Sequence, residues 1–347
     1  MSTSSASSFY GLSRDELAGV LSTQFGEAAF RAKQLFEWVY AQRIDQIERM
    51  TNISKPLRAK LADFFLFPKA RTLSRQISID GTRKYLFEVA PGKAVESVMI
   101  KQPKRDTLCI SSQVGCAMGC TFCRTATMGL KSNLSAAEIV SQVMAVIEDA
   151  KNFDDAFSNI VFMGMGEPLH NFDGVVRAIK ILTDPNGLAI APRKITVSTS
   201  GLVPKIKAFF ESGVGVSLAV SLNATTNEVR SKIMPVNKKY PIEELLGCLR
   251  ELPATKRRKF TIEYVMLAGL NDLDSDLKRL PKLLHAIPAK VNLIPYNENA
   301  ELGFRAPSKE KVRAWQSSLI SRGVDATIRW SKGADIKAAC GQLANIS

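Results

Sequence analysis

The sequence predicts an α/β protein in which short strands alternate with helices, preceded by a helical region and a small antiparallel sheet. Six apolar, β-rich stretches recur with helical stretches between them in residues 104–347. Short alternating stretches occupy residues 71–103, and residues 1–70 carry apolar side chains at helical spacing. We therefore expect a helical accessory domain, a linking β segment and a large α/β domain over these three ranges.

The helical region begins with a recognisable cap. Ser13 precedes the stretch RDELAGVLSTQF, and Glu16 follows three residues later, which is the pattern of a capping box. The stretches FRAKQLFEWVYAQ and KPLRAKLADFF continue with apolar residues at helical spacing. The basic side chains of this region could face RNA or simply water: Arg31, Lys33, Arg43, Lys55, Arg58 and Lys60.

The linking segment consists of three alternating stretches, RTLSRQISI, RKYLFEVA and AVESVMI, separated by DG and PG turns. After it come LCISS, NIVFMG, KITVSTS, GVSLAVSL, FTIEYVM and VNLIPY, with a helical stretch between each of these and the next. Strands separated by helices imply parallel βα units, either as an open doubly wound sheet or as a partial barrel. In both folds the chemistry gathers at the carboxyl ends of the strands.

The composition narrows the class of protein. The 347 residues include 47 Lys and Arg against 33 Asp and Glu, a net charge of +14, which favours a partner that carries phosphates. A merely basic protein and an acidic membrane surface are the alternatives. No apolar run approaches the ~20 residues that cross a bilayer, and the Ser-rich start lacks the features of a secretion signal. We expect a cytoplasmic protein without a membrane partner.

The strongest chemical signal is CAMGCTFC, which places Cys116, Cys120 and Cys123 on one short loop after the first strand of the large domain. Six cysteines in a cytoplasmic chain of this size favour metal or thiol chemistry over structural disulfides. Three thiolates on a 4Fe-4S cluster leave one iron open to another ligand. Zinc and three unliganded cysteines are the alternatives, but with only two histidines in the chain a closed zinc site is hard to assemble.

This CxxxCxxC loop followed by βα units resembles the radical S-adenosylmethionine (SAM) superfamily, in which the open iron binds SAM. The resemblance extends to the bacterial family of adenine C2 methyltransferases that act on 23S rRNA and tRNA. It covers roughly residues 108–343 and is carried by TLCISSQVGCAMGCTFC, GMGEPL, STSGLVP, SLNA, RSKIMPVN, VNLIPYN and DIKAACGQL. It implies a partial (β/α)6 barrel, a 4Fe-4S cluster on the three cysteines, and SAM as second cofactor.

The resemblance also implies the residues that bind SAM. GMGEP follows the strand NIVFM, and glycines there let the backbone approach a small ligand closely. The other implied contacts stand at the ends of later strands, where SLN replaces the more usual SLH of the superfamily. The implied SAM-binding positions are Gly166, Glu167, Ser198, Ser221, Leu222, Asn223 and Asn297.

The chemistry of the target explains why further cysteines are needed. C2 of adenine is not nucleophilic enough to take a methyl cation from SAM directly, so a radical route is required. The resemblance implies that Cys340 is first methylated, and that a 5'-deoxyadenosyl radical from a second SAM then activates this methyl group for addition to C2. It further implies that Cys109 releases the base by forming a transient disulfide with Cys340. Glu96 is the implied proton acceptor.

The same motifs bear on the alternatives to C2 methylation. C8 methylation of the same rRNA adenosine, an antibiotic-resistance activity, is the nearest alternative, but Pro168 in GMGEPL and Val114 in SQVGC favour C2. A non-catalytic RNA-binding metalloprotein would leave Cys340 unexplained.

The expected partners are 23S rRNA before full ribosome assembly, tRNA, and an electron donor such as flavodoxin or ferredoxin, with the chain acting as a monomer. The basic run at residues 256–259 could hold RNA phosphates, and Cys248 is expected in the core.

Overall fold

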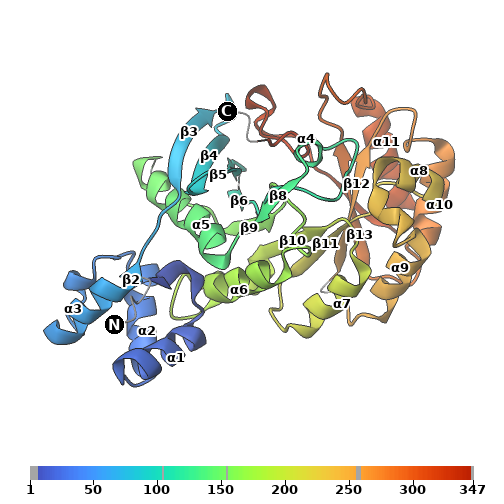
Figure 1. Cartoon of the computed structure of the whole chain (residues 1–347). Coiled ribbons are helices and arrows are strands. Elements are labelled where there is room, and N and C mark those ends of the chain that lie inside the picture. The colour runs from blue at the N-terminus through green and yellow to red at the C-terminus, as the bar shows by residue number, and fades with distance from the viewer. Residues whose placement is uncertain (1–6, 104, 154, 255–258, 345–347) are drawn as a thin grey trace.

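The computed structural model describes residues 7–103, 105–153, 155–254 and 259–344. A helical N-terminal region stands at one end of the molecule, and a curved sheet with helices outside it forms the rest (Figure 1). No helix in these described ranges is long and apolar enough to cross a membrane.

The N-terminal region folds as its sequence pattern predicts. The Ser13 side chain accepts a hydrogen bond from the Glu16 amide, and the Glu16 carboxylate accepts one from the Ser13 amide at 2.8 Å, so the predicted capping box is present. Aromatic rings fill its interior, with Phe9 in contact with Phe36 and Tyr40. Its elements are β1 (Ser7–Ser8), η1 (Phe9–Gly11), α1 (Arg14–Phe25), α2 (Phe30–Phe36), η2 (Glu37–Ala41), η3 (Ile47–Arg49), α3 (Lys55–Phe64) and β2 (Phe65–Leu66).

One sheet of ten strands runs through the rest of the described chain, in the order β14-β13-β12-β11-β10-β9-β6-β5-β4-β3. The strands β6 and β9 to β14 pair in parallel, whereas β3, β4 and β5 pair antiparallel and attach to β6 through β5. The strands are β3 (Arg71–Ile77), β4 (Arg83–Ala90), β5 (Lys93–Ile100), β6 (Thr107–Cys109), β9 (Asn159–Phe162), β10 (Ile195–Thr199), β11 (Ser217–Ser221), β12 (Phe260–Met266), β13 (Ala289–Pro295) and β14 (Asp325–Ile328).

Helices connect the parallel strands and contact their neighbours around the outside of the sheet: α5 with α6, α6 with α7, α7 with α9, and α10 with α11. The longest, α5, begins with a second capping box between Ser135 and Glu138. The helices are α4 (Arg124–Thr127), α5 (Ala136–Ala150), α6 (Phe172–Thr183), α7 (Val203–Glu211), α8 (Asn227–Ile233), α9 (Ile242–Glu251), α10 (Asp274–Leu283) and α11 (Lys309–Ser321), with short 3-10 turns η4 (Lys151–Phe153), η5 (Pro192–Lys194), η6 (Pro235–Lys238) and η7 (Ala334–Ile336).

The predicted fold class is confirmed, with two refinements. The six predicted strands are β6 and β9 to β13, all parallel, as expected of a partial barrel. A seventh parallel strand, β14, follows them; its four residues alternate in burial and were too few to predict a strand. The predicted antiparallel segment does not form a separate sheet, because β5 pairs with β6 and so extends the barrel sheet.

The two strands of a hairpin flank the cysteine loop in the sequence. It pairs β7 (Gln113–Gly115) with β8 (Leu130–Asn133). The amide of Cys116 donates a hydrogen bond to the carbonyl of Gly129 at 3.0 Å. This approach needs a glycine at position 115, where φ is +74° and a Cβ would lie 1.8 Å from the Gly129 oxygen.

We expect Gly115→Ala to destabilise the fold more than a matched change elsewhere. The substitution adds a collision with backbone to the cost of a left-handed alanine, which alone is about 1–3 kcal/mol. Gly323→Ala is the control, since φ there is +77° and a Cβ would meet nothing within 4 Å. Chemical denaturation of both variants tests this. Equal losses in free energy of unfolding would show that the close contact between residue 115 and the Gly129 carbonyl does not require glycine.

Candidate active site

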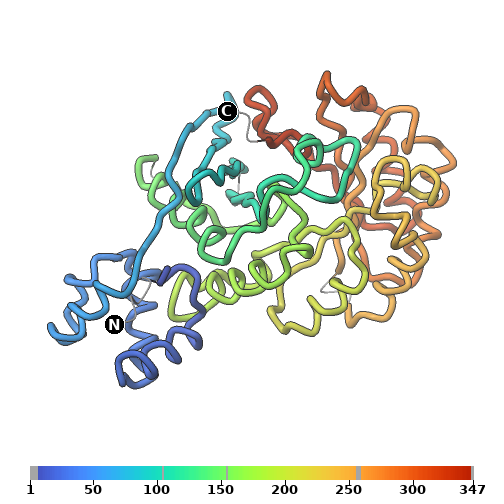
Figure 2. The backbone as a smooth tube through the Cα atoms, viewed as in Figure 1, coloured from blue at the N-terminus to red at the C-terminus, as the bar shows by residue number. Residues whose placement is uncertain are grey.

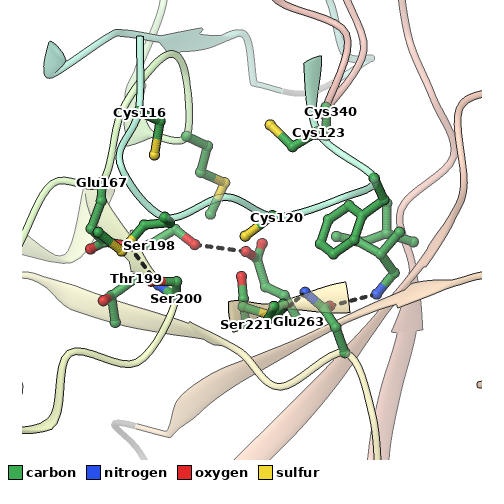
Figure 3. A pocket seen from close by; sticks show the side chains of 18 of the residues that line it. Cys116, Cys120, Cys123, Glu167, Ser198, Thr199, Ser200, Ser221, Glu263 and Cys340 are labelled. Atoms are coloured by element: carbon green, nitrogen blue, oxygen red, sulfur yellow. Dashed lines mark hydrogen bonds between the residues drawn. The ribbon is translucent and has the colours of Figure 1, made fainter. Parts of the chain in front are cut away.

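The candidate site is an open hollow at the carboxyl ends of the parallel strands. This is where parallel α/β folds place their ligands. Figure 3 shows the side chains of Cys116, Cys120 and Cys123 around the same space, with Ser198 and Glu263 close to Cys120. The structure thus brings together three cysteines and several strand-end residues that the sequence singled out separately.

The cysteine loop is held from several sides. The Thr121 amide donates to the carbonyl of Ile233 at 3.0 Å, and the Cys123 amide donates to that of Cys120 at 3.1 Å. A small apolar cluster of Phe122, Ala224, Ile233, Met234, Leu267 and Tyr296 packs against Cys120 and Cys123. The sulfur atoms therefore have low-dielectric material behind them and the hollow in front.

The thiols are strongly affected by this burial. Burial raises the pKa of Cys116 to about 12, and it also raises the pKa values of Cys120 and Cys123. The buried guanidinium of Arg230 acts on Cys120 in the opposite direction. Thiolates in such a place need a positive partner, which iron provides.

This donor set fits a 4Fe-4S cluster. In the part of the chain that the structure describes, no three His, Cys, Asp or Glu side chains are grouped to hold one metal ion. A cubane instead takes each thiolate on a different iron, and three thiols around one hollow leave the fourth iron free for SAM. The hollow also contains polar atoms without a hydrogen-bond partner, namely Ser200 Oγ and Glu263 Oε1, which a polar cofactor can satisfy.

The GMGEP segment requires its glycines because it lies against the start of the cysteine loop. A Cβ on Gly164 would lie 2.7 Å from the carbonyl oxygen of Ile110, and one on Gly166 would lie 2.5 Å from Cβ of Gln113. The Glu167 carboxylate is buried and accepts hydrogen bonds from the amides of Leu169 at 3.1 Å and Ser200 at 2.7 Å. Burial raises the pKa of Glu167, whereas these hydrogen bonds lower it.

The strand-end positions differ in what they offer. Ser198, Ser221, Asn223 and Asn297 line the hollow with Gly166 and Glu167, whereas Leu222 is fully buried beside it. Asn223 has a positive φ of 55°, and its amide oxygen accepts from the Val265 amide at 2.8 Å. Its amide is thus already engaged in the fold.

Asn297 connects the hollow to the C-terminal segment. Its side-chain amide donates to the carbonyl of Cys340 at 3.0 Å. The same segment is tied to the cysteine loop, because the Arg124 amide donates to the Gly341 carbonyl at 2.8 Å and Thr125 Oγ1 to that of Leu343 at 2.7 Å. Figure 2 shows the two segments running together, although more than 200 residues separate them in sequence.

Cys340 and Cys109 meet at a second hollow of about 530 Å³. Cys340 lines both hollows, and Cys109, at the end of β6, lines the second. Both thiols are free. Burial raises the pKa of Cys109 to about 12, and the neighbouring Cys340 adds to this effect. Because Cys340 lines both hollows, it lies between the cluster cysteines of the first hollow and Cys109 of the second.

Glu96 lies apart from both hollows. Its carboxylate forms an ion pair with Lys84 at 3.1 Å and accepts a hydrogen bond from the Ala344 amide at 2.7 Å. Burial raises its pKa, and Lys84 opposes this shift. In the structure Glu96 therefore anchors the C-terminal segment, and its implied part in proton transfer stays a prediction.

Three charged residues were missed by the sequence analysis. Glu263 was detectable as the lone acidic side chain in the apolar strand FTIEYVM; Ser198 Oγ donates to it at 2.7 Å. Arg230 donates to the carbonyls of Leu222 and Ser200 at 3.0 and 2.7 Å, which ties the ends of β10 and β11 together. Arg329 follows β14, which no pattern revealed, and lines the second hollow.

Comparisons with known proteins agree with this architecture. The radical SAM superfamily model matches residues 110–280, and the ribosomal RNA large subunit methyltransferase N-terminal domain model matches residues 8–66. A radical SAM methyltransferase from Sphaerobacter thermophilus superposes with a TM-score of 0.89 at 41% identity, covering 97% of this chain and 98% of that one.

Curated relatives cover nearly the whole chain. The dual-specificity RNA methyltransferase RlmN of Pelobacter propionicus is 51% identical over 318 residues, covering 92% of this chain and 90% of its own length. The protein of the same name from Geobacter sulfurreducens is 49% identical over 333 residues, covering 96% and 91%. Taken with the three cysteines that line one hollow and the Cys340 that joins it to the next, this similarity shows that the chain belongs to the RlmN family of radical SAM RNA methyltransferases.

Proposed function

We propose that this protein methylates C2 of a specific adenosine in 23S rRNA and of the adenosine next to the anticodon in some tRNAs, through a methylated Cys340. One observation carries the proposal: Cys340 is the cysteine that lines both hollows in the described chain, one with the three cluster cysteines and one with Cys109. The dual-specificity names of the relatives support C2 of both RNAs and do not favour C8.

The first hollow would hold both cofactors. Cys116, Cys120 and Cys123 would bind the 4Fe-4S cluster. When bound, the cluster and SAM supply the methyl group and the one-electron chemistry that C2 of adenine requires. The chain's own contribution is to hold SAM against the cluster, through Gly166, Glu167, Ser198, Ser221, Leu222, Asn223 and Asn297. Leu222 would act through its backbone, because its side chain is fully buried.

The two further cysteines would handle the methyl group. Cys340 would accept it and present it to adenine at the second hollow, and Asn297 would fix the Cys340 backbone through its 3.0 Å hydrogen bond. Release of the base needs loss of one electron, which the oxidised cluster would accept, and of the C2 proton. The Cys109 thiolate then attacks the Cys340 sulfur, the bond from that sulfur to the transferred carbon breaks, and the freed carbon takes up a proton to become the methyl group. The resulting disulfide would be reduced by thiol exchange.

Glu96 is retained as the proposed proton acceptor on the strength of the family resemblance. Its carboxylate is engaged by Lys84 and by the Ala344 amide. Taking up a proton from the base therefore requires the C-terminal segment to open at Ala344 first.

RNA would bind to the N-terminal region. The net charge of +14 favours phosphate contacts, and the family model of the rRNA methyltransferase N-terminal domain matches residues 8–66. Lys33, Arg43, Lys55 and Lys60 are exposed there, and Arg31 and Arg58 are half-buried. The basic run at residues 256–259 lies outside the described residues except for Lys259, which pairs with Asp325 at 3.3 Å.

We further propose that the protein works in the cytoplasm, where its RNA substrates are, as a monomer supplied with electrons by flavodoxin or ferredoxin. On the rRNA side it would act before the ribosome is fully assembled, since the folded particle would hide the target. An adenine in a stack would have to turn out to reach the second hollow, at a cost of a few kcal/mol.

The assignment is tested by the nucleosides that the protein makes. Reconstituted enzyme is incubated anaerobically with SAM, a reductant, and either unmodified 23S rRNA or unmodified tRNA, and the digests are compared by mass spectrometry with 2-methyladenosine and 8-methyladenosine. We expect 2-methyladenosine from both RNAs. Product from one RNA alone would remove the dual specificity, and 8-methyladenosine would overturn the C2 assignment.

We expect Cys340→Ala to abolish methylation and leave the cluster intact, because Cys340 would carry the methyl group but bind no iron. Cys248→Ala is the matched control, since Cys248 is a buried cysteine of α9 outside both hollows. Methylated base and bound iron are measured for both variants. If the Cys340→Ala variant methylated RNA at the rate of the protein without substitutions, the covalent mechanism would be ruled out.

A further inference from the structure

The second hollow contains a charged side chain that the proposed mechanism has not used. Arg329 lines it together with Cys109, Cys340 and Met163. The backbone of Arg329 is fixed at the end of β14, where its amide donates to the Leu293 carbonyl at 2.9 Å. A cation is thus built into the wall of the space where the two thiols meet.

The guanidinium is held in place by two contacts. Its Nη1 donates to the Met163 sulfur at 3.1 Å and lies 3.8 Å from Glu263 Oε1. The Glu263 carboxylate is itself fixed by Ser198 Oγ, and only 8% of its side chain is exposed. The side chain of Arg329 is 26% exposed, so its charge is partly shielded from solvent and acts strongly on neighbouring groups.

The groups that face Cys109 differ in their effect on its thiol. Burial raises its pKa to about 12, Cys340 and Glu263 add to this, and Arg329 opposes it. Lys332, the other cation in the wall of the hollow, lies 4.0 Å from Asp80. The electrostatic effect is mutual, since Cys340 and Cys109 both raise the pKa of Arg329. A thiol must be ionised to attack a sulfur atom, and cations favour that state.

We propose that Arg329 is a positioning residue for the cysteine pair, and that its guanidinium, in the wall of the hollow that both cysteines line, stabilises the Cys109 thiolate as it forms and attacks Cys340. The proposal rests on the proposed function in assigning Cys109 the attack on Cys340. It gives a reason for a fixed cation at this place, because a positive charge favours the ionised state of a neighbouring thiol.

The test measures the reactivity of Cys109 in the reconstituted enzyme. Alkylation by iodoacetamide is followed by peptide mass spectrometry over a range of pH under anaerobic conditions, in the unmodified protein and in R329Q, R329M and R329K. Opposite charges at short range shift a pKa by about 1–3 units. We therefore expect Cys109 to react about tenfold or more slowly at a fixed pH in R329Q and R329M, with R329K within about threefold of the unmodified protein.

Two controls separate the charge from a general loss of structure. Cys248 is the internal reference, because it is buried in α9 and, unlike Cys109, lines neither hollow, so it should keep its low reactivity in every variant. R322Q changes an exposed arginine just after α11 and should leave the Cys109 profile unchanged. If Cys248 becomes reactive in R329Q and R329M, these variants have lost structure and only R329K is used. A tenfold loss of Cys109 alkylation rate in a folded R329K would overturn the proposal. An unchanged Cys109 profile in a folded R329Q would overturn it as well.

A second readout distinguishes this proposal from the proposed function. If Arg329 supports the attack by Cys109, R329Q should accumulate RNA joined covalently to Cys340, as C109A should. Normal release of methylated RNA by R329Q would count against Arg329 and leave the methyltransferase assignment in place. If the unmodified protein makes no methylated base while R329Q still slows the alkylation of Cys109, the assignment fails and the charge effect stands.

Discussion

The site depends on the close approach of two backbone segments, residues 110–116 and 163–167. The Ser112 and Gln113 amides both donate to the Met165 carbonyl, at 2.9 and 3.1 Å, and the Gly164 amide donates to the Ile110 carbonyl at 3.1 Å. Because side chains cannot fit between the segments, glycine is required at positions 164 and 166. This contact places the first cluster cysteine directly above the strand ends that would bind SAM.

Much of this arrangement follows from the sequence. The strand stretches were predictable because buried parallel strands are short, apolar and β-branched. The cysteine loop was predictable because three thiols on one short loop suit a cubane with one open iron, an assignment that the family resemblance made specific. Once the strands are parallel, residues that end them must meet at one edge, so Ser198, Ser221 and Asn297 could be grouped without a structure.

What the sequence did not reveal depends on contacts between distant segments. Glu96 binds the Ala344 amide 248 residues away, and no local pattern records such a contact. Arg329 follows a four-residue strand that alternates too briefly to be recognised. Arg230 reads as a surface helix residue, yet it is fully buried because strand-end carbonyls need donors there.

The continuous ten-stranded sheet has a consequence for how a substrate is chosen. The exposed edge strand β3 and the Cys109 strand β6 are separated by β4 and β5, with each neighbour hydrogen-bonded to the next. Adjacent strands lie about 4.8 Å apart, so about 14 Å of rigid sheet separates β3 from β6. Because the N-terminal region that would hold the RNA directly precedes β3, the width of the sheet would limit which bases along the RNA fold can reach the cysteines.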